Sequence, residues 1–206
     1  MTTPDLIFDG PTKAATTVAL THGAGAPMDT AFMQTFADGL AGEGLRVARF
    51  EFPYMAQRRV GGSKRPPNTA KVLIETWDAV INKLGANSLV IGGKSMEGRI
   101  ASMVADETQV KGLVCLGYPF HPPGKPEKIR VEHLQALKTP TLFLQGDRDT
   151  LGNREDVSGY PLSSTIKLHW LEDGDHGFKP RKKSGRTEQQ NWDEAISVFV
   201  NFVRSL

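Results

Sequence analysis

The sequence has a single cysteine, Cys115, among its 206 residues. One cysteine excludes an intramolecular disulfide, so the composition gives no sign of an oxidising compartment. No apolar run approaches the ~20 residues that a membrane-spanning helix needs. The first ten residues carry two acidic side chains and no basic segment leading into an apolar run, so we expect no signal peptide. These absences predict a cytoplasmic protein without a membrane partner.

The chain also lacks a strong excess of charge of one sign. Its 25 lysine and arginine residues stand against 23 aspartate and glutamate residues, for a net charge of +2. A charge this small does not indicate a nucleic-acid partner. The 39% hydrophobic and 23% charged residues are ordinary for a globular protein. The length predicts one domain over residues 1–206, and the oligomeric state stays open.

Short apolar runs alternate with longer segments of helical period. We expect strands at residues 6–8, 16–20, 46–50, 89–92, 112–116, 141–145 and 165–171. We expect helices at 29–42, with Asp29 as N-cap, and at 69–84, 95–106 and 188–204, the last with a Thr187–Gln190 capping box. This order predicts an α/β fold, with a mostly parallel sheet of about six or seven strands and helices on both faces. Ligands of such sheets bind beyond the carboxyl ends of the strands.

The loop after the fourth of these strands carries the segment Gly92-Gly93-Lys94-Ser95-Met96-Glu97-Gly98. A phosphate-binding P-loop is excluded, because the glycine that it needs five positions upstream is Ser88. A nucleophile elbow fits better, since that motif places a serine at a sharp strand-to-helix turn between small residues. Ser95 is therefore the candidate nucleophile.

One residue departs from the elbow pattern. The G-x-S-x-G rule requires glycine at position 97, where this chain has Glu97. A glutamate there is expected either to crowd the turn or to place a carboxylate near a forming oxyanion, and either effect would slow the reaction. The competing interpretation makes Ser95 an ordinary residue at the start of a helix.

A serine nucleophile needs a base and an acid that orients the base. Of the five histidines, His176 is the best base, because it directly follows the last strand on a glycine-flanked loop. Asp149 is the preferred acid and Asp147 the second choice, since both follow the strand at 141–145. The order Ser95, Asp149, His176 is one of the known chain orders for a serine triad. We expect the backbone amides of Met96 and Ala24 to form the oxyanion hole.

With these residues placed, the chain resembles the α/β-hydrolase superfamily, and within it a small group of predicted hydrolases similar to dienelactone hydrolases. Testis-expressed and chromatin-complex hydrolase-like proteins look similar too. The resemblance covers nearly the whole chain and is most specific at residues 53–55 and 118–125. It implies the Ser95–Asp149–His176 triad, no cofactor and no metal. The residues assigned to substrate binding are His22, Tyr54 and His121.

Two further segments bear on the substrate. Residues 117–140, where many relatives insert a lid, are rich in proline and glycine and predict only one short helix, at about 132–137. Without a lid, small or exposed esters are favoured over long lipids. Residues 57–65 and 179–186 are strongly basic and contain no acidic residue, so they are either solvated loops or a surface for an anionic substrate or partner.

The sequence therefore predicts a serine hydrolase that cleaves small ester or thioester substrates through an acyl-enzyme. The alternative is a weak or inactive hydrolase-like scaffold that binds an anionic partner through its basic loops. Glu97 and those loops support the alternative, and the complete triad argues against it.

Overall fold

The computed structural model describes residues 3–63 and 65–206. Within these residues one sheet has the strand order β1-β3-β2-β4-β5-β6-β7. Strand β1 runs antiparallel to β3, and the other neighbouring strands are parallel. The strands are β1 Leu6–Asp9, β2 Thr17–Thr21, β3 Arg46–Phe50, β4 Leu89–Lys94, β5 Gly112–Leu116, β6 Thr141–Gly146 and β7 Ile166–Leu171. The predicted α/β fold with a mostly parallel sheet is confirmed.

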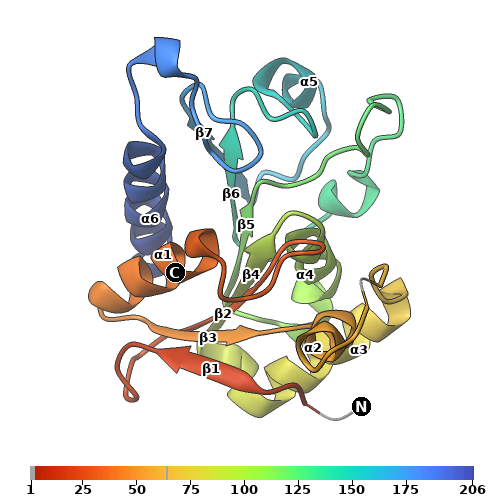
Figure 1. The fold of residues 1–206 in the computed structure, drawn as a ribbon, viewed down its shortest axis with the longest axis vertical. Coiled ribbons are helices and arrows are strands. Elements are labelled where there is room, and N and C mark those ends of the chain that lie inside the picture. The colour runs from red at the N-terminus through yellow and green to blue at the C-terminus, as the bar shows by residue number, and fades with distance from the viewer. Residues whose placement is uncertain (1–2, 64) are drawn as a thin grey trace.

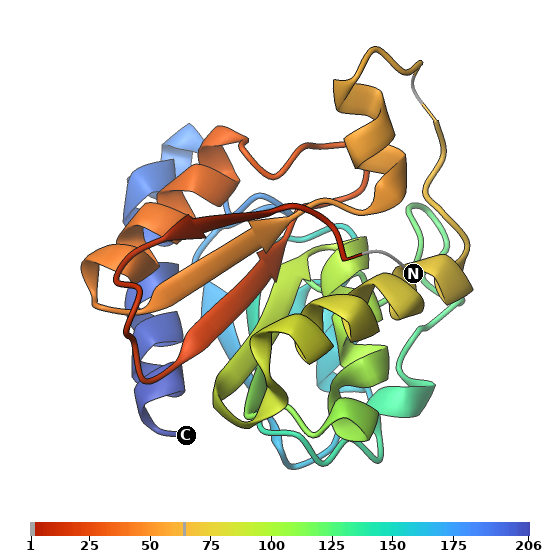
Figure 2. The same ribbon diagram turned by 90° about the horizontal axis from the view of Figure 1, so that it is seen from below.

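Helices cover both faces of this sheet (Figure 1). The described α-helices are α1 Ala31–Gly42, α2 Pro53–Arg59, α3 Ala70–Leu84, α4 Met96–Thr108, α5 Arg154–Ser158 and α6 Glu188–Arg204. Figure 2 shows the sheet between a layer that holds α1 and α6 and a layer that holds α3 and α4. The site described below lies at the carboxyl ends of the central strands, as expected for a sheet of this kind.

The core consists of two apolar clusters, one on each face of the sheet. On the buried strand β4, Val90 packs into the cluster under α1 and α6, and Ile91 packs into the cluster under α3 and α4. Successive side chains of a strand point to opposite faces, so a strand buried on both faces must be apolar throughout. Cys115, in β5, is fully buried in the second cluster, as its apolar surroundings in the sequence indicate.

Helix α1 starts two residues later than predicted. Its N-cap is Thr30, whose hydroxyl accepts a hydrogen bond from the Met33 amide at 3.3 Å. The expected cap, Asp29, instead pairs with Arg59 at 2.8 Å. An exposed ion pair with a distant arginine therefore leaves the capping role to the next residue. Helix α6 begins at Glu188 with the predicted Thr187–Gln190 capping box.

Two short helices were missing from the prediction, although each has a local signal. Helix α2 has Pro53 in its first turn, where proline is favoured because its fixed φ suits a helix start. Helix α5 has Asn153 as N-cap and a capping box with Asp156. Both helices are too short to display a helical hydrophobic period, so the pattern alone does not reveal them.

The connection from β5 to β6 carries no lid domain. Its residues 117–140 contain one 3-10 turn, Glu132–Leu134, shorter than the helix predicted there. Tyr118 and Phe120 of this connection are fully buried against Phe143 of β6, where Tyr118 stacks at 4.7 Å between ring centroids and Phe120 makes an edge-on contact at 5.8 Å. The connection is therefore packed down onto the core, and it leaves the carboxyl edge of the central strands open.

Candidate functional site

Ser95 lies at a sharp turn between β4 and α4. Its backbone has φ 57° and ψ −125°, a strained combination for any residue with a Cβ atom. The Ser95 amide donates to the Leu116 carbonyl of β5 at 3.0 Å, which ties the turn to the neighbouring strand. Strain of this kind costs on the order of 1–3 kcal/mol and persists only where the surrounding structure enforces it. The geometry matches the elbow that the sequence predicts.

Two glycines make this turn possible. A Cβ atom on Gly98 would lie 2.4 Å from the Gly93 carbonyl oxygen. A Cβ atom on Gly93 would lie 2.8 Å from the Thr21 side chain and 3.1 Å from the Gly98 amide. The close approach of strand and helix therefore requires glycine at positions 93 and 98. Position 97 carries a side chain without disturbing the turn.

The structure brings Ser95, His176 and Asp149 into one hydrogen-bonded chain. The His176 Nε2 atom lies 2.8 Å from Ser95 Oγ, and His176 Nδ1 lies 2.7 Å from Asp149 Oδ2. With the proton on Nδ1 directed at the carboxylate, Nε2 can accept the Ser95 proton. Loops after three different strands thus place Ser95, His176 and Asp149 within hydrogen-bond reach of one another.

The Asp149 carboxylate is fully buried and held from three sides. In addition to His176, it accepts hydrogen bonds from Gln145 Nε2 at 2.9 Å and from the Leu151 amide at 2.8 Å. The Gln145 amide also bonds to the backbone of Tyr118 and to the Gly152 carbonyl. These bonds fix the carboxylate orientation, as is typical of a residue that must hold an imidazole in one tautomer.

Ser95 and His176 line a pocket of about 520 Å³ between α1 and α6. Most of its wall is apolar, and a few polar groups converge near the serine. The apolar side chains are those of Ala24, Ala26, Phe32, Met33, Leu151 and Trp192. An apolar hollow of this size with a few converging polar groups is typical of a small-molecule site.

Both amides predicted for the oxyanion hole belong to segments beside Ser95. Met96 is the first residue of α4, where backbone amides have no acceptor within the helix. Ala24 lines the pocket, in a turn closed by a bond from the Ala26 amide to the Gly23 carbonyl. The Met96 and Ala24 amides therefore stay the predicted donors of the oxyanion hole.

The comparison with protein families agrees with this geometry. Residues 14–204 match the model of a family described as an alpha/beta hydrolase domain. The chain belongs to this family of α/β hydrolases. The match spans every strand from β2 to β7 and includes Ser95, Asp149 and His176.

Solved structures with the same fold include two serine hydrolases of bacteria. One is described as an alpha-beta serine hydrolase homologue from Coxiella burnetii, with 20% identity, TM-score 0.67, and coverage of 98% of this chain and 90% of that one. Another, from Xanthomonas campestris, is described as an α/β serine hydrolase without lid, with 19% identity, TM-score 0.69, and coverage of 98% and 88%. At these identities the similarity establishes the fold of this α/β hydrolase.

Sequence reasoning missed Lys94, which precedes the serine. Its Nζ atom donates to the His176 carbonyl oxygen at 2.6 Å, and it lies 5.6 and 5.8 Å from the ring centroids of Phe32 and Phe178. Lys94 also lines the pocket. Its desolvation by these neighbours lowers the pKa of the ammonium group to about 8. The sequence signal for Lys94 was its position between Gly93 and Ser95. That position was considered only as part of a P-loop, which was excluded.

Glu97 turns away from the pocket into the core of this α/β hydrolase. It is fully buried, and its Oε1 accepts a hydrogen bond from the Tyr54 hydroxyl at 2.6 Å. Its Oε2 has no hydrogen-bond partner among the described residues. Burial raises the pKa of this carboxyl to about 7. The expectation that Glu97 crowds the elbow was therefore wrong, because the close contact of the turn falls on Gly98.

The three residues assigned to substrate binding do not line the pocket beside Ser95. His22 is fully buried, with Nδ1 2.9 Å from the Gly23 carbonyl and Nε2 accepting from the Phe52 amide. Tyr54 is buried against Glu97. His121 is also buried, with Nδ1 3.1 Å from the Pro122 carbonyl oxygen. Each follows a strand as expected, but its polar atoms face protein groups instead of the pocket.

The two basic segments lie far apart on the molecule, with residues 57–63 at the end of α2 and residues 179–186 at the top of Figure 1. Their arginines mostly have internal partners. Arg59 pairs with Asp29 and Glu51, Arg181 pairs with Asp173, and Arg186 pairs with Glu172 and Glu194. Lys64 lies outside the described residues. These contacts brace loops, so the segments do not form one free basic surface.

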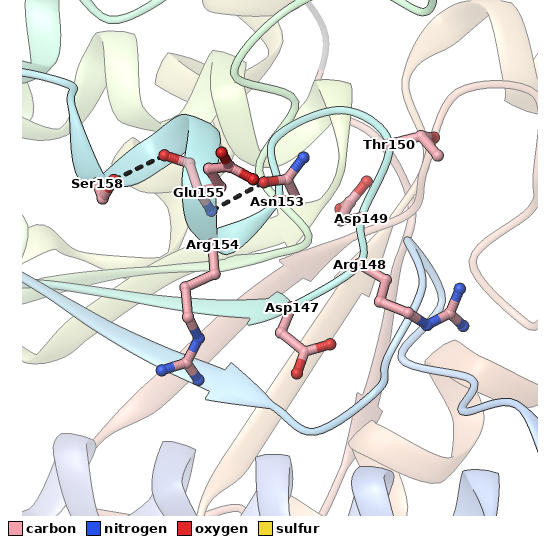
Figure 3. A pocket seen from close by; sticks show the side chains of 8 residues that line it. All are labelled: Asp147, Arg148, Asp149, Thr150, Asn153, Arg154, Glu155 and Ser158. Carbon is pink, nitrogen blue, oxygen red and sulfur yellow. Dashed lines mark hydrogen bonds between the residues drawn. The ribbon is translucent and has the colours of Figure 1, made fainter. Parts of the chain in front are cut away.

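A second hollow, of about 660 Å³, lies behind the Asp149 loop and around α5 (Figure 3). Its lining is polar and includes the Asn153 and Glu155 groups that form the start of α5. Neither Ser95 nor His176 lines it, and the Asp149 carboxylate is fully buried. This hollow is therefore separate from the pocket that contains the serine.

Two features are absent from residues 3–63 and 65–206. No helix there is long and apolar enough to cross a membrane. No group of three or more histidine, cysteine, aspartate or glutamate side chains there is arranged to hold a metal ion.

Proposed function

We propose that this α/β hydrolase cleaves small ester or thioester substrates through a Ser95–His176–Asp149 triad. The observation that carries the proposal is the continuous chain of hydrogen bonds from Ser95 Oγ through His176 to a buried, fully bonded Asp149. A neutral serine is a poor nucleophile, and this arrangement supplies the base and the orienting acid that it lacks.

In the proposed reaction, Ser95 Oγ attacks the carbonyl carbon of the substrate while His176 Nε2 takes the serine proton. The carbonyl π electrons move onto oxygen, and the amides of Met96 and Ala24 stabilise this oxyanion. Collapse of the intermediate expels the alcohol or thiol, which receives the proton from His176. A water molecule, deprotonated by His176, then attacks the acyl-enzyme, and the acid is released with Ser95 restored.

The shape of the site supports small substrates. The pocket opens to solvent beside a packed β5–β6 connection, and its volume of about 520 Å³ suits a small molecule. One similar structure, Est1E from Butyrivibrio proteoclasticus, has ferulic acid bound, with 16% identity, TM-score 0.69, and coverage of 98% of this chain and 96% of that one. An acid of comparable size is a reasonable acyl group for this pocket.

The proposal is tested by turnover of a panel of para-nitrophenyl esters, short thioesters and lactones. Ser95→Ala should abolish turnover of every substrate that the unmodified protein hydrolyses. Ser102→Ala is the matched control, because Ser102 Oγ also lies 2.8 Å from a histidine, His133, but donates to the Arg99 carbonyl. Absence of turnover across the panel, or turnover that survives Ser95→Ala, would contradict the proposal.

A further inference from the structure

A desolvated cation faces the pocket beside the candidate nucleophile. Lys94 is half-buried and lines the pocket together with Ser95 and His176. An ammonium group has three donors, and one of them bonds to the His176 carbonyl. The aromatic rings of Phe32 and Phe178 lie within 6 Å of the charge. The remaining donors have no hydrogen-bond partner among the described residues, and Lys94 belongs to the lining of the pocket.

Lys94 has no counter-ion in contact. None of the ion pairs within 4.0 Å among the described residues includes it. Asp149 and Asp175 act on it only from beyond that distance, and Asp149 is already bonded to His176. A partly dehydrated charge without a paired carboxylate is costly, and a ligand anion would relieve that cost.

Three arginines of the basic segments differ from Lys94 in this respect, while the lysines of residues 179–186 form no ion pair within 4.0 Å among the described residues and do not line the pocket. In the two basic segments, Arg59, Arg181 and Arg186 are paired with carboxylates. The pocket itself contains one acidic side chain, Glu188, at the start of α6, and it does not pair with Lys94. We therefore expect Lys94, rather than the basic loops, to attract an anionic substrate to the pocket.

We propose that Lys94 selects esters whose acyl group ends in a carboxylate, such as half-esters of short dicarboxylic acids. The inference rests on the proposed function, because it assigns the substrate class of the same site. The acyl group stays covalently bound to Ser95 after the alcohol leaves, so it occupies the pocket that Lys94 also lines. The side chains of Phe32 and Trp192 provide an apolar wall for the methylene chain.

The kinetic test compares matched para-nitrophenyl substrates that differ in one charge. Half-esters of succinic, glutaric and adipic acid are paired with the corresponding methyl esters, which have the same chain length without the negative charge. At pH 7 we expect kcat/KM for the best half-ester to exceed that of its methyl ester by about 10- to 100-fold, the range for a hydrogen bond to a charged group. A ratio of one or below in the unmodified protein would overturn the proposal.

Three variants assign the preference to one residue. Lys94→Met should bring the ratio close to one, whereas Lys94→Arg keeps the charge and should retain most of the preference. Lys182→Met, in the exposed basic segment, is the matched control and should leave the ratio unchanged. The ratio isolates charge recognition from any general loss of activity, because both substrates use the same triad. A preference that survives Lys94→Met would overturn the assignment.

A binding measurement separates this inference from the proposed function. In the Ser95→Ala background, calorimetry should show tighter binding of the half-ester than of the methyl ester, and Lys94→Met should remove the difference. The binding measurement gives a result even if no substrate is hydrolysed. Absence of hydrolysis would overturn the proposed function but not the role of Lys94 in binding. Equal binding of the two compounds would overturn the role of Lys94.

Discussion

Two ionisable residues of opposite type, Lys94 and Glu97, flank Ser95 in the sequence and have different surroundings. Lys94, one residue before the serine, lines the pocket and bonds to the His176 carbonyl. Glu97, two residues after it, is sealed in the core against Tyr54. The strand-to-helix turn directs the two side chains to different parts of the molecule. Lys94 and Glu97 are therefore expected to affect different properties of the protein. We propose that Lys94 acts on the ligand and on His176, and that Glu97 acts on folding stability.

The proposed triad includes Ser95 itself, and breaking it should have the largest effect. Asp149→Asn should lower kcat by roughly 10⁴-fold, because the amide stabilises the wrong imidazole tautomer while leaving the packing intact. The measurement is steady-state hydrolysis of the best ester at pH 7, with circular dichroism as the folding control. A loss of less than tenfold would show that Asp149 does not orient the base.

Glu97 should make the free energy of unfolding depend on pH. Burial raises its pKa from 4.5 to about 7, so the folded state holds this proton more tightly than the unfolded state. The stabilisation is complete below pH 4.5 and is lost as the pH rises through 7. The loss amounts to about 3 kcal/mol, since a tenfold change in proton affinity is worth ~1.4 kcal/mol. Glu97→Gln should remove this component from urea unfolding measured between pH 4 and 9.

The quantity to compare is the free energy of unfolding of the unmodified protein and of Glu97→Gln at each pH. Glu97→Gln keeps the acceptor for the Tyr54 hydroxyl, so its stability should change less between pH 4.5 and 7. Parallel curves for the two proteins would mean that Glu97 is not held in its protonated form by the fold.

Replacing Lys94 should lower the turnover rate of neutral esters. Lys94→Met removes the bond to the His176 carbonyl, so the imidazole is held less firmly against Ser95. We expect kcat for a neutral ester to fall about tenfold, with KM little changed, because small displacements of a catalytic group reduce rate more than binding. An unchanged kcat would show that the His176 loop does not depend on Lys94.

The smallest effect should be that of Glu97 on activity. Glu97→Gln should change kcat/KM for a neutral ester by less than about threefold at pH 6, because the carboxyl is directed at Tyr54 and is partly protonated there. Steady-state rates of the two proteins give the ratio. A larger increase in the variant would place the charge of Glu97 near the oxyanion after all.

Much of the fold was predictable because strand and helix patterns are local. The apolar runs gave six parallel strands to within a residue or two, and the capping box of α6 gave its start. Ser95, Asp149 and His176 could be found together because each follows a strand, and parallel strands bring their carboxyl ends to one edge of the sheet.

The remaining features depend on where side chains point, which a one-dimensional pattern does not contain. The direction of a side chain decides that His22 and His121 are buried while Lys94 faces the pocket. The glycine requirement at position 98 also depends on a contact with Gly93 across the turn. Gln145, which holds Asp149, is a polar residue at the end of an apolar strand, and that contrast is the signal that was overlooked.

Covalent labelling can show whether Ser95 is the nucleophile. The protein is treated with a fluorophosphonate probe and digested, and the labelled peptide is identified by mass spectrometry. We expect one adduct, on Ser95, that is lost in Ser95→Ala, kept in Ser102→Ala and formed much more slowly in Asp149→Asn. No adduct on the folded protein, or an adduct on another serine, would contradict this expectation.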